Sequence, residues 1–155
     1  AFGTGSHPTT SLCLRWLDQH LVPGERVVDY GCGSGILGVA AGLLGAGEIT
    51  GVDIDPQAVS ASRDNATANG VIATFHEPDA APVAPGDVVV ANILANPLRV
   101  LAPLICSLAK PGGRIVLSGI LTDQAESVRE AYRPHVDFEA PLEEEGWVCL
   151  WGTRR

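Results

Sequence analysis

Short apolar runs alternate with helix-like segments along most of this chain, and no other feature constrains its fold as strongly. Four runs are almost continuously apolar, and each is a predicted strand: residues 26–30, 48–55, 87–92 and 114–119. Strands that are apolar on both sides are typical of parallel sheets covered by helices on both faces. The predicted fold class is therefore α/β.

Helix signals occupy the intervals between these runs. Asp55 is a suitable N-cap and Pro56 a suitable first helical residue, and this helix should end at Asn69-Gly70. Apolar residues at helical spacing predict further helices over residues 13–21, 35–44, 97–108 and 122–132.

Three further strands complete the predicted sheet. One is expected over residues 71–75, and a C-terminal hairpin should pair residues 136–140 with residues 147–151. The acidic run 143–145 is expected in the hairpin turn. The sequence thus predicts a mostly parallel, seven-stranded sheet with helices on both faces and an antiparallel C-terminal hairpin.

Size and charge are those of one globular domain. The chain has 155 residues, 46% of them hydrophobic, which is enough to bury a single core. Its longest apolar stretches are shorter than the ~18 to 20 residues of a membrane span. The net charge of −8 disfavours nonspecific binding to a phosphate backbone. We expect a cytoplasmic protein that binds neither membranes nor nucleic acid directly.

The cysteines and the first residues add two expectations. The four cysteines are scattered without a C-x-x-C pair, so no metal site is predicted and reduced thiols are expected. The chain has no Met and opens on AFGTGSHPTT, a stretch typical of a functional loop. We therefore expect a part of a longer protein.

A ligand-binding crevice is expected where the first two predicted strands end. The first strand runs into Gly31, Gly33 and Gly35, and the second ends at Asp53. Ligands of open α/β sheets bind beyond the carboxyl ends of the strands. Glycines let a ligand approach the main chain closely, and a carboxylate at this place can hold both hydroxyls of a ribose. The pair predicts a nucleoside-containing ligand.

Spacing and charge favour S-adenosylmethionine over a dinucleotide. The loop reads G-x-G-x-G, and Ile36 stands where the dinucleotide fingerprint G-x-G-x-x-G requires glycine. Asp29, two residues before the first glycine, would repel a pyrophosphate and attract a cation. S-adenosylmethionine carries an ammonium and a sulfonium group and no phosphate, so it fits this charge better.

The motifs resemble one family. VVDYGCGSG and GVDID are similar to the glycine loop and the acidic second-strand end of class I S-adenosylmethionine-dependent methyltransferases. Together with AFGTGSHPTT, VVVANILANPL, KPGG and LSGIL, they resemble the bacterial methyltransferases of ribosomal protein L11 over nearly the whole chain. The resemblance implies a Rossmann-like fold and one methyltransferase domain over residues 1–155. The family's separate, preceding substrate-recognition domain is expected to be absent from this chain.

The same resemblance implies roles for five residues. Thr10, Gly31, Asp53 and Asn92 match positions that contact the cofactor, and Gly33 belongs to the same loop. Asp53 would hold the ribose and Gly31 the amino-acid part, while Thr10 would close over the cofactor from the opening loop. Asn92 lies at the carboxyl end of the fourth strand along the chain, where the methyl group leaves, and is the expected catalytic residue.

The implied reaction is methyl transfer to an amine by in-line displacement. The family's products are trimethylated lysines and a trimethylated N-terminal amine of ribosomal protein L11. The alternatives are a methyltransferase with another protein or small-molecule acceptor, a noncatalytic cofactor-binding module and, disfavoured by Ile36 and Asp29, an NAD-dependent oxidoreductase.

Several residues near these motifs have structural interpretations as well. Cys32, between two glycines, is expected to be a small buried residue, and His7 is either a proton relay or a capping residue. Trp147 and Trp151 fall on one face of the last strand and are expected to pack in the core.

Overall fold

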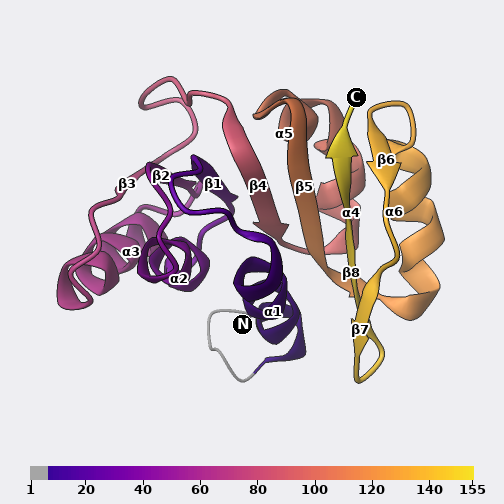
Figure 1. Cartoon of the computed structure of the whole chain (residues 1–155), viewed down its shortest axis with the longest axis horizontal. Helices are drawn as coiled ribbons and strands as arrows, with labels where there is room; N and C mark the ends of the chain where they lie inside the picture. Colours follow the sequence, from indigo (N-terminus) through magenta and orange to yellow (C-terminus); the bar gives the residue numbers. More distant parts are fainter. Residues whose placement is uncertain (1–6) are drawn as a thin grey trace.

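Seven strands lie side by side in one sheet, and an eighth, short strand pairs with the last strand of the chain. The structure is a computed structural model that describes residues 7–155. The strand order is β3-β2-β1-β4-β5-β8-β6, and β7 also pairs with β8 (Figure 1). The strands are β1 Val27–Tyr30, β2 Ile49–Val52, β3 Thr74–His76, β4 Gly86–Asn92, β5 Ala109–Leu121, β6 Val136–Phe138, β7 Leu142–Glu144 and β8 Trp147–Arg154. The first five are parallel, and β8 is antiparallel to β5, which confirms the predicted mixed sheet.

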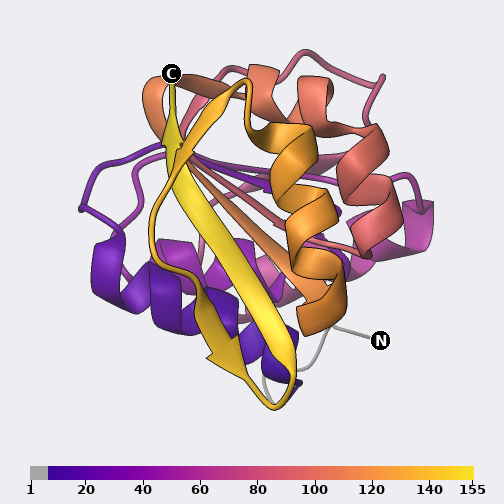
Figure 2. The ribbon, with the colours of Figure 1, turned by 90° about the vertical axis from the view of Figure 1, so that its right-hand side faces the viewer.

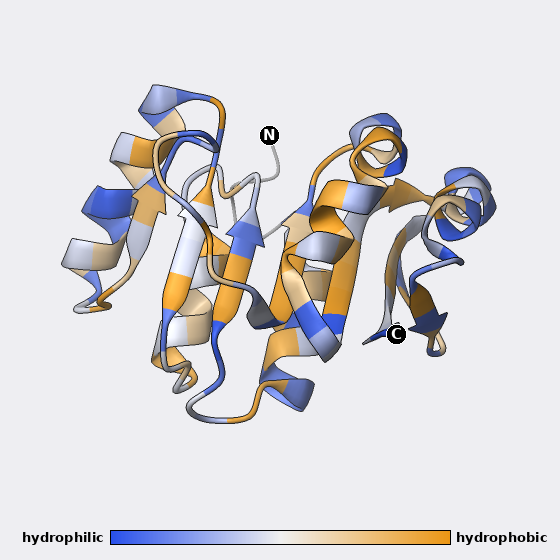
Figure 3. Ribbon diagram, turned by 90° about the horizontal axis from the view of Figure 1, so that it is seen from above, coloured by the Kyte–Doolittle hydropathy of each residue, from blue (hydrophilic) through white to orange (hydrophobic). Residues whose placement is uncertain are grey.

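Helices cover both faces of this sheet (Figure 2). They are α1 Pro8–His20, α2 Ile36–Leu43, α3 Pro56–Ala68, α4 Ala95–Val100, α5 Ala102–Ser107 and α6 Ala125–Tyr132, with a 3-10 turn, η1, over Thr122–Gln124. Alternate residues of β4 point to opposite faces, so Val88 and Val90 pack with α1 and α2, whereas Val89 packs with α4, α5 and α6. Figure 3 shows hydrophobic residues concentrated in the central strands. Among residues 7–155, no helix is long and apolar enough to span a membrane.

The C-terminal hairpin differs from its prediction. Residues of β6 pair with the second half of β8, and β7 pairs with the first half. The turn is Glu145-Gly146, both with positive φ (51° and 82°), so Glu143 and Glu144 lie in a strand. Pro141 separates the two short strands because proline donates no hydrogen bond to a sheet ladder.

Other boundaries also differ, and α1 begins five residues earlier than predicted. The predicted helix over residues 97–108 is two helices that meet at Leu101, and the missing N–H of Pro103 contributes to this break. The predicted helix over residues 122–132 begins as η1. The strand expected over residues 71–75 is β3, which begins three residues later than predicted, at Thr74. The start of α3 is confirmed, because the Asp55 carboxylate accepts a hydrogen bond from Gln57 N at 2.9 Å.

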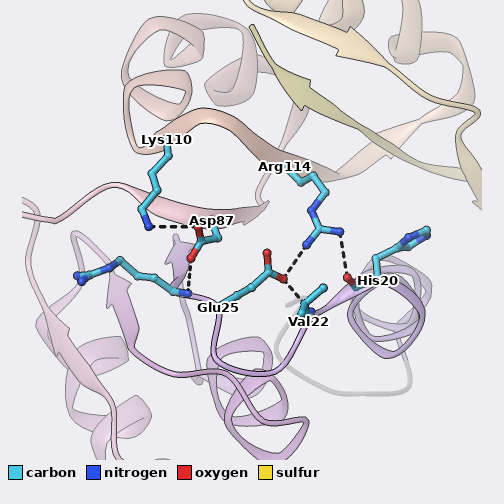
Figure 4. Close-up of polar contacts among 7 residues, drawn as sticks. His20, Val22, Glu25, Asp87, Lys110 and Arg114 are labelled. Carbon is cyan, nitrogen blue, oxygen red and sulfur yellow. Dashed lines mark hydrogen bonds and ion pairs between the residues drawn. The ribbon is translucent and has the colours of Figure 1, made fainter.

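Polar contacts fix the amino-terminal edge of the sheet, opposite the candidate site (Figure 4). Arg114, in β5, donates to a Glu25 carboxylate oxygen at 2.6 Å and to the His20 carbonyl at 2.9 Å. Asp87, in β4, accepts from Lys110 Nζ and from the main-chain N–H of Arg26, and this main-chain bond lowers the pKa of Asp87. These contacts tie β1, β4 and β5 together at the end where α1 leads into β1.

One buried hydrogen bond joins α6 to α4, and its loss should be measurable. The Tyr132 hydroxyl donates to the Leu98 carbonyl at 2.7 Å, with both residues fully buried. Tyr132→Phe leaves that carbonyl without this donor, so the free energy of unfolding in urea should fall by about 1 to 2 kcal/mol. Tyr30→Phe is the control, because Tyr30 is only partly buried. Equal losses in the two variants would contradict the assignment.

Candidate functional site

The strand order reverses between β1 and β4, and a cleft lies at the carboxyl ends of these strands. Strand β1 pairs with β2 on one side and with β4 on the other, and the chain continues outward in both directions. The cleft has a volume of about 570 Å³, within the usual range of ~300 to 1,000 Å³ for small-molecule sites. Gly31, Gly33, Asp53 and Asn92 all line it, so the fold brings four of the five predicted site residues together.

The glycine loop leaves an open space at its centre. Gly31, Gly33 and Gly35 all have positive φ, at 75°, 55° and 82°. A Cβ atom on Gly31 would lie 2.6 Å from a methyl carbon of Ile93, and one on Gly35 would lie 2.9 Å from the Ser62 side chain. A Cβ atom on Gly33 would meet nothing within 4 Å. Packing therefore requires two of the glycines, whereas Gly33 exposes main chain to the cleft.

The Asp53 carboxylate links the glycine loop to the next loop. One oxygen accepts from Gly33 N and the other from Asp55 N, both at 2.9 Å. A carboxylate offers about four lone pairs, so each oxygen can accept a further hydrogen bond. Asp53 therefore stiffens the loops and keeps acceptor capacity for ligand hydroxyls.

Asn92 lies at the carboxyl end of β4 and contacts Thr10. Its Nδ2 donates to Thr10 Oγ1 at 3.4 Å, and its Oδ1 is buried with no hydrogen-bond partner among residues 7–155. A buried carbonyl oxygen without a partner is costly, by about 1 to 3 kcal/mol, so a residue that lines the cleft keeps an unsatisfied acceptor.

The position of Thr10 corrects one expectation. Thr10 lies in the first turn of α1, fully buried, and not in a loop as predicted, because His7 caps that helix and Pro8 begins it. Its hydroxyl reaches Asn92 from behind the cleft wall. The first six residues of the opening stretch AFGTGSHPTT lie outside the described residues.

Burial changes the charge of Asp29. Its carboxyl group accepts a hydrogen bond from Gly38 N at 3.2 Å and is almost inaccessible to water. Desolvation raises the pKa of Asp29 to about 7, although the Gly38 bond acts in the opposite direction and the nearby Asp53 carboxylate adds to the rise. Asp29 is thus partly protonated near neutral pH, so its repulsion of phosphate is weaker than its residue type suggests.

The structural interpretations of Cys32 and His7 are confirmed, whereas Trp147 and Trp151 lie at the margin of the core and not within it. Burial raises the pKa of Cys32 to about 12, which keeps its thiol protonated and unreactive. His7 is the N-cap of α1, where its Nδ1 accepts from Thr9 N at 3.2 Å. Trp147 and Trp151 are half-buried against the core cluster that contains α1. Within residues 7–155 there is no group of three His, Cys, Asp or Glu side chains placed to hold a metal ion.

Sequence reasoning missed the apolar wall of the cleft. Leu94, Pro97 and Leu101 line it opposite the glycine loop. Their spacing of three and four residues is that of one helix face, and this spacing is the signal that could have revealed them.

Comparisons with known proteins identify the family of this chain. The family model described as "Ribosomal protein L11 methyltransferase (PrmA)" matches residues 1–155. The ribosomal protein L11 methyltransferase of Thiobacillus denitrificans is 61% identical over 155 residues, which are 100% of this chain and 52% of the relative. The chain thus spans about half the length of the curated relatives it matches.

Solved structures show the same fold. The crystal structure of a ribosomal protein L11 methylase from Lactobacillus delbrueckii subsp. bulgaricus superposes with a TM-score of 0.89 at 30% identity, covering 97% of this chain and 81% of that one. An RNA methyltransferase from Salinibacter ruber, solved with S-adenosyl-L-homocysteine, has a TM-score of 0.74 at 22% identity, covering 93% and 90%. The second likeness concerns the fold alone, which is Rossmann-like. With its entire length matched by the family model, this chain belongs to the ribosomal protein L11 methyltransferase family.

Proposed function

We propose that this chain is a catalytic domain that transfers methyl groups from S-adenosylmethionine to amine nitrogens of ribosomal protein L11. The observation that carries the proposal is the meeting of three features at one edge of the sheet. These are the open space over Gly33, the Asp53 carboxylate and the unpaired Oδ1 of Asn92. Family membership supplies the reaction and the substrate class.

The residues of the cleft fit S-adenosylmethionine. In this proposal the main chain at Gly31 and Gly33 holds the amino-acid part, and the remaining lone pairs of Asp53 accept from the ribose hydroxyls. Thr10 acts from α1, in contact with Asn92. When bound, the sulfonium group supplies an activated methyl and a good leaving group, so a strong general base is not needed. The chain's task is to hold the nucleophile in line and keep water away.

The apolar wall suits an amine acceptor. A free lysine amine has a pKa near ~10.4 and is mostly protonated at neutral pH, whereas the nucleophile must be neutral. Desolvation beside Leu94, Pro97 and Leu101 would lower the pKa of an entering amine. We propose lysine side chains and the N-terminal amine as the acceptors, with Asn92 Oδ1 accepting a hydrogen bond from the acceptor nitrogen.

The domain organisation, the partner and the location of the protein are proposed on the same basis. The curated relatives are about twice as long as the part that this chain matches, which supports a separate domain for substrate recognition before this one. A net charge of −8 is complementary to a basic protein substrate. We propose a cytoplasmic location, without direct binding to nucleic acid or membranes.

The decisive experiment is transfer of labelled methyl groups to purified ribosomal protein L11 by the full-length protein that contains this chain. Incorporation at amines, mapped by mass spectrometry, is expected. If S-adenosylmethionine binds in calorimetry but no label is incorporated, the protein is a binding module or uses another acceptor. If NAD binds and S-adenosylmethionine does not, the proposed cofactor is wrong.

Asp53→Ala should weaken the binding of S-adenosylmethionine to the full-length protein. The loss of hydrogen bonds to a charged group should cost roughly 1.5 to 3 kcal/mol, measured by calorimetry. Asp55→Ala is the matched control, since Asp55 caps α3 two residues away. That variant should lose about 1 kcal/mol of unfolding free energy and keep its affinity. Unchanged affinity in Asp53→Ala would remove Asp53 from the ribose site.

A further inference from the structure

Ser118 lies beside Asn92 but outside the cleft. The two residues are register partners in the parallel pair β4–β5. Ser118 is fully buried, and Gly119 follows it with a φ of 92°. The pairing of β5 with β8 shifts register between Leu117 and Ile120, so Ser118 lies at an irregularity of the sheet directly next to the proposed catalytic residue.

The Ser118 hydroxyl binds α1 and no residue of the cleft. Its Oγ donates to the main-chain carbonyl of Thr9 at 2.9 Å. Thr9 and Thr10 are both fully buried in the first turn of α1. The next side chain along that turn, Thr10, accepts from Asn92 Nδ2. A continuous chain of contacts therefore leads from Ser118 through Thr9 and Thr10 to Asn92.

The last contact in this chain depends strongly on position. The distance from Asn92 Nδ2 to Thr10 Oγ1 is 3.4 Å, at the long end for a hydrogen bond, so a small outward shift of the α1 turn would break it. The terminal torsion of asparagine is broad and holds no single orientation by itself. Asn92 Oδ1, buried without a partner among the described residues, gives no restraint. Among residues 7–155, the Thr10 contact is therefore the side-chain hydrogen bond that restrains the amide.

We propose that Ser118 is a positioning residue for the active site. By holding the first turn of α1 against β5, it keeps Thr10 Oγ1 within reach of Asn92 Nδ2, which leaves Asn92 Oδ1 as the group that can accept a hydrogen bond from an incoming amine. This inference rests on the proposed function for its catalytic consequence. The physical arrangement itself can be tested without any methyl transfer.

The test compares Ser118→Ala, Thr10→Val and Cys106→Ala in the full-length protein. The first reading is the pair of side-chain amide signals of Asn92 in a proton–nitrogen NMR spectrum, assigned by their loss in Asn92→Ala. Ser118→Ala should move these signals in the same direction as Thr10→Val, without ligand present. Cys106, buried in α5 within the core cluster on the other face of the sheet, is the control for a general loss of packing. Cys106→Ala should leave the Asn92 signals in place.

The second reading is turnover. Ser118→Ala should lower kcat for methyl transfer about 10-fold, the lower part of the range for a misplaced catalytic group, with the Kd of S-adenosylmethionine within about twofold. Adding Ser118→Ala to Thr10→Val should cause no further loss, because both act through one contact.

The outcomes distinguish a failure of the Ser118 inference from a failure of the proposed function. Asn92 signals that stay in place in Ser118→Ala, or a kcat equal to that of Cys106→Ala, would overturn the role of Ser118. If the signals move as expected while the wild-type protein methylates nothing, the positioning holds and the proposed function fails. Should Ser118→Ala not fold, as judged by its melting temperature, Ser118→Cys supplies a weaker donor and should show intermediate shifts.

Discussion

Replacing Asn92 with alanine should lower the turnover of methyl transfer by about 100-fold while changing the Kd of S-adenosylmethionine only a few-fold. The buried Oδ1 of Asn92 has no protein partner among residues 7–155, so its hydrogen bond would form with the acceptor amine. The hydrogen bond strengthens as the amine nitrogen gains positive charge in forming its bond to the methyl group, so it stabilises the transition state more than the bound cofactor. The variant therefore loses kcat and keeps most of its affinity.

The measurements are single-turnover kinetics and calorimetry on the full-length protein. Asn96→Ala is the matched control, because Asn96 is exposed on α4 and its side chain accepts a hydrogen bond from Arg99, away from the cleft. It should behave as the wild type in both measurements. Equal losses of turnover and affinity in Asn92→Ala would mean that Asn92 only binds the cofactor.

The free energy of unfolding should carry a contribution from Asp29 that decreases as the pH rises from about 4 to about 7. In the folded protein burial raises the pKa of Asp29 to about 7, against an ordinary value of 3.8. Below the lower value the carboxyl group is protonated in both states. Between the two values the folded state holds a proton that the unfolded state releases, so unfolding becomes easier with each unit of pH. Above about pH 7 the carboxyl group is ionised in both states, and Asp29 has lowered the free energy of unfolding by about 4 kcal/mol relative to its value below pH 4.

Asp29→Asn removes this titration and keeps an oxygen that can accept from Gly38 N. Urea unfolding at several pH values gives the difference between variant and wild type, in which the contributions of other groups cancel. This difference should grow in favour of the variant between pH 4 and 7 and then level off. Two parallel curves would show that Asp29 ionises alike in the folded and unfolded states.

Much of the fold could be predicted because its signals are local. The apolar runs that became β1, β2, β4 and β5 are buried on both faces, so their composition alone indicates a parallel sheet. The N-cap of α3 depends on neighbouring residues, and Asp55 caps it as expected. The hairpin was less predictable, since β6 and β7 share the outer edge of β8 through pairings set by tertiary contacts.

The candidate site likewise has a part that the sequence predicts and a part that only the structure shows. Gly31, Gly33, Asp53 and Asn92 follow predicted strands, and parallel strands end at one edge, so their convergence on one cleft follows from the sequence pattern. The apolar wall and Ser118 come from contacts between distant segments. Thr9 and Ser118 are 109 residues apart along the chain.

The sequence by itself determined the layered α/β architecture, the edge at which a ligand binds and the residue types present there, because periodicity, capping and glycine content act over a few residues. Only the tertiary structure decided the state of those residues. It buried Asp29 until its pKa rose to about 7, placed Thr10 in a helix and left one oxygen of Asn92 without a partner in the described part of the chain. Charge and hydrogen-bonding capacity depend on solvent access and on neighbours from other strands and helices, which exist only once the chain is packed.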